Sequence, residues 1–263
     1  MNAPADELIV ERKGGVVWVT FNRPQARNAL TWNMYSRLET ACHEINADRS
    51  VRAVVLTGAG GQAFVAGTDI AQFRAFTTEQ DALDYEARGN VVMRTLESVR
   101  VPTIAAIAGA CTGAGAAIAA CCDIRIASPS ARYGFPIART LGNCLSMANY
   151  TRAAALIGFA RLKDLILRAR LMDAQEMLAC GLVSEVSPDE DSLLTRAQAI
   201  ADEVASMAPL TLWATKEALR RIRDTLMPEG ADSDLIVACY TSQDFKEGVE
   251  AFLAKRRPNW TGE

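Results

Sequence analysis

The segment PTIAAIAGACTGAGAAIAACCD (Pro102–Asp123), here called the organising segment, gives the clearest indication of the fold of this chain. It begins with a short, partly β-branched apolar run (Thr103–Ile107), passes through small residues around Gly113, and ends in an alanine-rich stretch. This order predicts a buried strand, a tight turn and a buried helix. Because glycine and alanine add little bulk to the backbone, the turn predicts a close approach to a ligand or to a neighbouring helix.

The uncharged run over residues 101–122 has two other readings, a membrane span and a nucleotide-binding loop. Pro102 at its head, the glycines within it and a mean hydropathy near zero for the whole chain favour a soluble domain with no membrane partner. The glycines match neither a dinucleotide fingerprint with its acidic residue nor a phosphate-binding loop with its lysine.

A second stretch, GAGGQAFVAGTDI (Gly58–Ile70), repeats this arrangement upstream. A predicted strand over Ala53–Thr57 leads into a glycine-rich turn, and a helix is expected to start near Thr68. The first backbone N–H groups of a helix have no partner within the helix. We therefore expect N–H groups of the two turns to converge on one oxygen atom.

Composition limits the classes of function. The chain has 263 residues, half of them hydrophobic, and a net charge of −3, which gives no indication of nucleic-acid binding. The N-terminus has no secretory signal pattern, and the seven cysteines, mostly in apolar runs, show no paired metal-ligand spacing. These features predict a cytoplasmic protein with reduced cysteines and no metal site. The single histidine, His43, lies off the buried stripe of a predicted helix, which excludes histidine-based triads and multi-histidine metal sites.

Strands and helices alternate up to the predicted strand that ends at Ala127, and only helices are predicted from Ala153 onward. A hairpin is expected over Leu8–Phe21, Thr31 is expected to cap a helix, and a capping box at residues 77–80 predicts a helix ending near Ser98. Asp123–Ala127 reads as a strand and Ala131–Gly142 as a loop. We expect an α/β core over residues 1–200 and a helical region over residues 201–263. Later helices are predicted over Ala153–Arg170, Asp173–Ala179, Leu193–Met207, Leu210–Leu226 and Ser233–Lys255.

Four ordered motifs carry a family resemblance: FNRPQARNAL (21–30), AVVLTGAGGQAFVAGTDI (53–70), PTIAAIAGACTGAGAAIAACCDIRIA (102–127) and EGVEAFLAKRRPNW (247–260). Together they resemble the crotonase superfamily, the enoyl-CoA hydratase/isomerase group, from about Leu8 to Trp260. The resemblance implies an α/β fold, a spiral of ββα units whose helical C-terminal region forms trimers, often paired into hexamers. The expected assembly is therefore a homotrimer or a dimer of trimers.

The resemblance also implies a common chemistry, in which an acyl-CoA thioester is converted to its enolate. No prosthetic group is needed, since coenzyme A enters as part of the substrate. Two backbone N–H groups bind the thioester oxygen, and they map to Thr68 and Ala114, where the family usually has glycine at the second position. Preorganised donors of this kind are worth roughly 10²–10³ in rate each.

Contacts to coenzyme A carry over more loosely from the family. Phe252 and Lys255 match tail positions that in relatives reach the coenzyme of a neighbouring subunit; the alternatives are a core aromatic residue and a solvated basic tail. The remaining candidates come from two segments and from the organising turn: Arg27 and Ala29, then Ala66, Thr68, Asp69, Ile70 and Ala71, and Gly113.

The chain departs from the family at the two glutamates that activate water in hydratases. Their positions correspond to Ala117 and to Ile137, or to Ala138 if a gap falls earlier, and none of these can exchange a proton. Asn143 and Ser146 are candidate catalytic residues in the following loop.

Other side chains near this loop carry weaker expectations. Arg139, Thr140 and Cys144 are polar neighbours, and Cys144 is expected to be structural because no histidine is available to activate it. Tyr133 and Asp69 could also approach the pocket, although Asp69 is better explained as the residue that begins a helix.

Several functions remain open at this stage. The first is a hydratase/isomerase-family enzyme that uses the two N–H donors and residues other than carboxylates. Decarboxylation is attractive because loss of carbon dioxide generates an enolate without a base, whereas thioester hydrolysis still needs a positioned water. A noncatalytic acyl-CoA-binding subunit would also keep both turns.

Overall fold

Two β-sheets form the framework of the protein. The computed structural model describes residues 6–225 and 232–262. In the larger sheet β1 and β2 form an antiparallel hairpin, as expected, and every other neighbouring pair is parallel. Its strand order is β1-β2-β3-β5-β7-β10, with bounds β1 (Leu8–Lys13), β2 (Val16–Phe21), β3 (Ala53–Gly58), β5 (Thr103–Ile107), β7 (Ile124–Ala127) and β10 (Glu185–Val186).

The second sheet has the order β4-β6-β8-β9 and is made of very short strands. Three times the chain passes from a strand of the larger sheet directly to a short strand of the second, from β3 to β4, from β5 to β6 and from β7 to β8. This alternation is the spiral of ββα units that the resemblance implied, so the expected fold class is confirmed. The bounds are β4 (Ala63–Val65), β6 (Ala110–Thr112), β8 (Arg132–Gly134) and β9 (Met172–Asp173).

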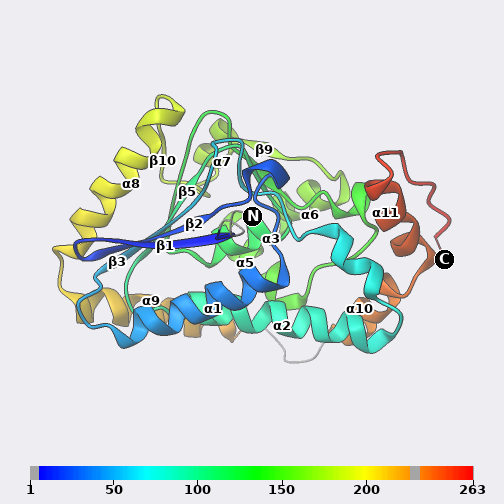
Figure 1. Ribbon diagram of the computed structural model, residues 1–263, viewed down its shortest axis with the longest axis horizontal. Coiled ribbons are helices and arrows are strands. Elements are labelled where there is room, and N and C mark those ends of the chain that lie inside the picture. The colour runs from blue at the N-terminus through cyan, green and yellow to red at the C-terminus, as the bar shows by residue number, and fades with distance from the viewer. Residues whose placement is uncertain (1–5, 226–231, 263) are drawn as a thin grey trace, which may run out of the picture.

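Helices α1 (Trp32–Ala47) and α2 (Glu79–Glu97) pack side by side across one face of the larger sheet (Figure 1). The Thr31 hydroxyl caps α1 by accepting a hydrogen bond from the backbone N–H of Met34. Thr78 and Asp81 form a capping box at the start of α2, one residue later than the box expected over residues 77–80. The cap of α1 was therefore predicted at the correct residue, and the start of α2 to within one residue.

Helix α3 (Ala114–Cys121) follows the organising strand and turn, as expected. The expected helix near Thr68 is instead a 3₁₀ helix, η2 (Ile70–Ala75); another, η1 (Pro24–Ala26), lies upstream. The segment predicted as a loop over residues 131–142 contains β8 and α4 (Ile137–Thr140). That prediction was wrong because elements of three or four residues have no periodicity to detect.

Two of the later helices that were predicted as continuous are each divided into two. One predicted helix divides at Gly158, which has φ 75°, and another divides before α11, where Ser242 caps the new helix. The predicted division at residue 200 falls inside α8, and Leu226 lies outside the described residues. The helices are α5 (Met147–Ile157), α6 (Phe159–Leu167), α7 (Ala174–Ala179), α8 (Glu190–Ala205), α9 (Pro209–Asp224), α10 (Ser233–Tyr240) and α11 (Gln243–Leu253).

Each face of the larger sheet is covered by its own apolar layer. One layer joins the sheet to α1, α2 and α3, and the other packs α8 onto the opposite face through Leu193, Ala197 and Ile200. Helices α10 and α11 lie at one end of the molecule, with α10 against α2 (Figure 1). This end carries a separate cluster of aromatic side chains that includes Phe73, Tyr240 and Phe245.

A buried charge cluster ties three helices together. Glu97 at the end of α2 accepts a hydrogen bond from Arg152 on α5 at 2.9 Å and pairs with Arg223 on α9. The side chains of Glu97 and Arg152 are almost completely buried. A charge in such a place is stable only with its partners present.

None of the helices in the described part of the chain combines the length and the apolar character that a membrane crossing requires. The organising segment divides instead into two strands, β5 and β6, a turn at Gly113 and an eight-residue helix. The strand β6 was not predicted.

Candidate active site

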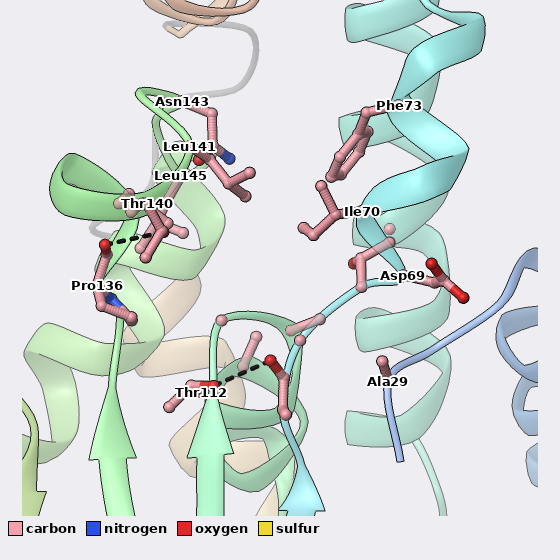
Figure 2. Close-up of a pocket in the computed structure, with 18 of the residues that line it drawn as sticks. Ala29, Asp69, Ile70, Phe73, Thr112, Pro136, Thr140, Leu141, Asn143 and Leu145 are labelled. Carbon is pink, nitrogen blue, oxygen red and sulfur yellow. Dashed lines mark hydrogen bonds between the residues drawn. The ribbon is translucent and has the colours of Figure 1, made fainter. Parts of the chain in front are cut away.

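A cavity of about 500 Å³ opens between η2 and α2 on one side and the segment from α4 to α5 on the other. Figure 2 shows Ile70 and Phe73 on one wall, facing Leu141 and Leu145 on the other. Thr112, at the end of β6, lies at the base between them (Figure 2). The size and the mainly apolar lining suit a small organic ligand.

The two glycine-containing turns meet at this base. A Cβ atom on Gly113 would lie 3.6 Å from the Cα atom of Gly67, so about one methyl group would fill the gap between the two glycines. The Thr112 hydroxyl donates to the Ala66 carbonyl at 3.0 Å and joins the turns directly (Figure 2). A Cβ atom on Gly115 would fall 2.0 Å from the Val65 carbonyl oxygen, so only glycine fits there.

The backbone N–H groups of Thr68 and Ala114 are free to bind a ligand. Ala114 is the first residue of α3, so its N–H has no partner within the helix. Among the described residues neither N–H donates a hydrogen bond, and both residues line the cavity. The Thr68 hydroxyl is held between those of Tyr35, at 2.8 Å, and Tyr85, at 3.0 Å. The hydrogen bonds of Thr112 and of the Thr68 hydroxyl hold both turns in the absence of a ligand. The two N–H groups are therefore preorganised.

Most of the residues expected to contact coenzyme A line the cavity, but two do not. Ala71 and Lys255 are exposed and lie outside its lining. Asp69 accepts a hydrogen bond from the Ala71 N–H and pairs with Arg23 at 3.1 Å, so it begins η2 as expected. The expected residues that do line the cavity are Arg27, Ala29, Ala66, Thr68, Asp69, Ile70, Gly113 and Phe252.

The two positions that correspond to the family glutamates both line the cavity. Ala117 comes from the buried side of α3, and Ile137 begins α4. Ala138, the alternative to Ile137, is exposed and lies outside the lining. Neither position that faces the cavity carries a group that can give or take a proton.

The catalytic candidates of the following loop differ in their placement. Asn143 lines the cavity, and its Nδ2 donates to the Tyr240 hydroxyl at 3.0 Å. Its Oδ1 is buried and accepts no hydrogen bond from the described residues. Ser146 is fully buried outside the lining, and its hydroxyl donates to Asn90 Oδ1 at 3.1 Å. Of the two, only Asn143 is placed to contact a ligand.

The weaker candidates near this loop contribute little. Arg139 is exposed, and Tyr133 is buried in the core outside the cavity lining. Thr140 lines the cavity, but its hydroxyl donates to the Pro136 carbonyl (Figure 2). The neighbouring Cys239 thiol and burial together raise the pKa of Cys144, so it is a poor nucleophile.

The structure adds one ionisable residue that the sequence patterns did not single out. Glu86 on α2 is 8% exposed, lines the cavity, and accepts a hydrogen bond from the Tyr240 hydroxyl at 2.6 Å. Burial raises its pKa to about 7, against the opposing hydrogen bonds from Tyr240 and Ser146. A sequence signal did exist, because Glu86 lies on the same helical stripe as the buried residues Ala82 and Met93.

Comparisons with known proteins agree on one family. The family model described as enoyl-CoA hydratase/isomerase matches residues 11–263. The short-chain-enoyl-CoA hydratase of Clostridium acetobutylicum is 37% identical over 96% of both chains. The crotonyl-CoA hydratase of Syntrophomonas wolfei is 33% identical over 97% of this chain and 98% of its own.

Solved structures give the same result for the fold. An enoyl-CoA hydratase/carnithine racemase from Magnetospirillum magneticum is 34% identical, covers 98% of this chain and 96% of its own, and has a TM-score of 0.79. A methylmalonyl-CoA decarboxylase in complex with 2-nitronate-propionyl-CoA is 25% identical, covers 98% and 99%, and has a TM-score of 0.88. The ββα spiral, the two turns and these matches together place the chain in the enoyl-CoA hydratase/isomerase family of the crotonase superfamily.

Proposed function

We propose that this protein is an acyl-CoA enzyme that polarises the thioester carbonyl and works through the resulting enolate. The observation that carries the proposal is a pair of N–H groups, those of Thr68 and Ala114, that have no partner among the described residues and lie on two hydrogen-bonded turns beside one cavity. Negative charge grows on the thioester oxygen as the enolate forms. Fixed donors stabilise that charge more than the neutral carbonyl, and each is worth roughly 10²–10³ in rate.

The protein would bind its substrate through the coenzyme A part, and no prosthetic group would take part. Arg27 supplies positive charge beside the cavity, and Phe252 supplies an aromatic surface. Two relatives are named as hydratases of short-chain enoyl-CoA and of crotonyl-CoA, which supports a short acyl chain here as well. An apolar cavity of about 500 Å³ fits that substrate class.

Decarboxylation of a malonyl-type thioester is the second candidate reaction. It is favoured by the apolar residues Ala117 and Ile137 at the positions where hydratases have glutamate, and by the high structural similarity to a methylmalonyl-CoA decarboxylase. Expulsion of carbon dioxide generates the enolate without a base, so only its later protonation needs an acid.

We also propose that the protein assembles as a homotrimer or a dimer of trimers in the cytoplasm. Helix α9 has no buried residue and exposes Leu210, Leu219 and Ile222. An exposed apolar helix face of this kind supports contact with another copy of the chain. The trimer itself is the assembly implied by the family resemblance.

The test is a panel of CoA thioesters with the products read by mass spectrometry: crotonyl-CoA, a 3-enoyl-CoA, methylmalonyl-CoA and butyryl-CoA. Gain of water, movement of the double bond or loss of carbon dioxide would each support enolate chemistry and identify the reaction. Release of free CoA as the sole reaction would identify a thioesterase. Tight CoA binding without any product would identify a noncatalytic binder, and both of these outcomes would overturn the proposal.

Two variants at Ala114 separate the N–H donor from the rest of the turn. Ala114→Pro removes the N–H at the first helical position, where proline is well tolerated, and we expect a rate loss of roughly 10²–10³. Ala114→Gly keeps the N–H and should retain activity. Equal rates in the two variants, both folded by circular dichroism, would refute the oxyanion assignment.

A further inference from the structure

We propose that Glu86 is a catalytic residue that moves protons to and from the carbon next to the thioester carbonyl. It would stand in for the carboxylates absent at Ala117 and Ile137. The assignment rests on the enolate chemistry proposed above and adds to it the group that exchanges the proton.

The face of α2 that carries Glu86 borders the cavity. Glu86, Gly89 and Met93 all line it, at the spacing of three and four residues that places side chains on one side of a helix. A Cβ atom built on Gly89 meets nothing within 4 Å. Glycine is unfavourable inside a helix, and here it leaves open space one turn from the carboxyl group. A bound acyl group can occupy that space beside Glu86.

Glu86 is also the carboxyl group that remains available for chemistry. Among the described residues that line the cavity, only Asp69 and Glu86 carry carboxyl groups. Asp69 is occupied with the start of η2 and with Arg23. Glu86 forms no ion pair with the described residues, and its hydrogen bond from Tyr240 fixes its position. The Tyr240 hydroxyl in turn accepts a hydrogen bond from Asn143 Nδ2. Tyr240 is therefore a positioning residue, because it holds the Glu86 carboxyl group in place.

Its surroundings tune this carboxyl group for proton exchange near neutral pH. Burial raises its pKa to about 7, so the acid and the carboxylate are both populated there. Asp232 raises the pKa further, whereas hydrogen bonds from Tyr240 and Ser146 lower it. The other titratable groups that sense its charge are Tyr35 on α1, Tyr85 on α2, Cys144 before α5 and Tyr150 on α5.

The proposed step balances without a further reactant. The C–H bond next to the thioester carbonyl breaks, and its proton goes to the Glu86 carboxylate. The electron pair of that bond forms the C=C bond of the enolate, and the carbonyl π pair moves to the oxygen held by Thr68 and Ala114. Glu86, now a carboxylic acid, returns the proton to the same carbon in the reverse step. After a decarboxylation the acid form would protonate the enolate in the same way.

Exchange of hydrogen for deuterium in butyryl-CoA tests this step without assuming the physiological reaction. The protein is incubated with butyryl-CoA in D₂O, and the mass gain of the acyl group is followed over time. We expect exchange in the parent protein and a loss of roughly 10²–10⁴-fold in Glu86→Gln. Asp84→Asn, on an exposed position of the same helix, is the matched control and should exchange like the parent. Equal rates in Glu86→Gln and Asp84→Asn, or no exchange in the parent, would overturn the assignment.

The pH profile provides a second readout that does not depend on the folding of Glu86→Gln. Exchange by the carboxylate should rise with pH, with a midpoint near 7 in the parent. Tyr240→Phe removes a hydrogen bond that favours the charged form, so its midpoint should move to higher pH. A midpoint that is the same in both proteins would contradict the pairing.

The proposal fails separately from the function on which it rests. If exchange is lost in Ala114→Pro but kept in Glu86→Gln, the oxyanion site stands and the Glu86 assignment falls. If Ala114→Pro and Ala114→Gly exchange equally, the oxyanion assignment falls, whatever Glu86 does. Calorimetry with butyryl-CoA should show that Glu86→Gln still binds, because the change affects the proton and preserves the shape of the side chain.

Discussion

Replacement of Glu86 by glutamine should change how the stability of the fold depends on pH. The pKa of Glu86 is raised from 4.5 to about 7 by burial, so the folded protein holds this proton more tightly than the unfolded chain does. Between these two pKa values the folded state binds more protons, and the free energy of unfolding therefore falls as pH rises. Above about pH 7 the full penalty of a buried carboxylate is present.

The size of the effect follows from the shift. At about 1.4 kcal/mol for each pKa unit, a rise from 4.5 to about 7 corresponds to about 3 kcal/mol. Glutamine keeps the size of the side chain and its hydrogen bond from Tyr240 but does not titrate. The stability of Glu86→Gln relative to the parent should therefore improve by about 3 kcal/mol between pH 4.5 and pH 8.

Urea unfolding followed by circular dichroism, at several pH values and one protein concentration, measures this difference. Asp84→Asn serves as the control, because Asp84 is exposed on the same helix and should leave the pH dependence of the parent unchanged. Stability curves of Glu86→Gln and the parent that run parallel across this range would refute a raised pKa for Glu86. The proton-transfer role would then lose its electrostatic support.

Four further predictions follow from where these side chains lie. Gly89→Ala should raise the free energy of unfolding by about 0.5–1 kcal/mol in thermal or urea unfolding, because the added methyl group meets open space. Gly89→Leu should instead fill the cavity and raise KM more for longer acyl chains than for acetyl-CoA; equal effects would mean that the acyl group lies elsewhere. Glu97→Ala should destabilise the fold by about 3–5 kcal/mol, because it leaves Arg152 and Arg223 without their buried partner. In the proposed trimer Lys255 reaches the coenzyme of a neighbouring subunit, so Lys255→Ala should weaken CoA binding severalfold in calorimetry, with no change in stability because the side chain is exposed. Unchanged affinity would refute this contact.

The sequence predicted those parts of the fold that have long periodic signals or marked ends. The first strand and the helix of the organising segment, the first hairpin and the cap at Thr31 are confirmed. The capping box of α2 lies one residue later than expected, at Thr78 and Asp81. The second sheet was not predicted from the residues, because its strands are only two or three residues long. Such strands have no alternation to detect and are defined only by the long strands that precede them.

Prediction of the candidate site had a similar limit. The two turns could be found because glycine is placed there for a backbone reason: Gly67 has φ 116° and Gly113 has φ 56°, which side-chain-bearing residues rarely adopt. Glu86 was missed because a charged residue on a helix is usually solvated. Its place on the buried stripe of α2 was a local sign of burial. Its hydrogen-bond partner, Tyr240, is 154 positions away in the sequence and belongs to a different helix, so no local pattern could reveal that pairing.

The proposed use of backbone N–H groups in the two turns has a consequence for how an enzyme of this kind can evolve. Every residue except proline supplies the same amide, so mutation around Thr68 and Ala114 can alter shape and fit while the amide donors persist. Ala117, Ile137 and Glu86, in contrast, have chemistry that changes with each substitution. New reactions can therefore arise by substitution of a few residues that line the cavity. Throughout such changes the N–H groups would continue to polarise the thioester carbonyl. Directed evolution of this chain should accordingly vary α2 and α4 and leave both turns untouched.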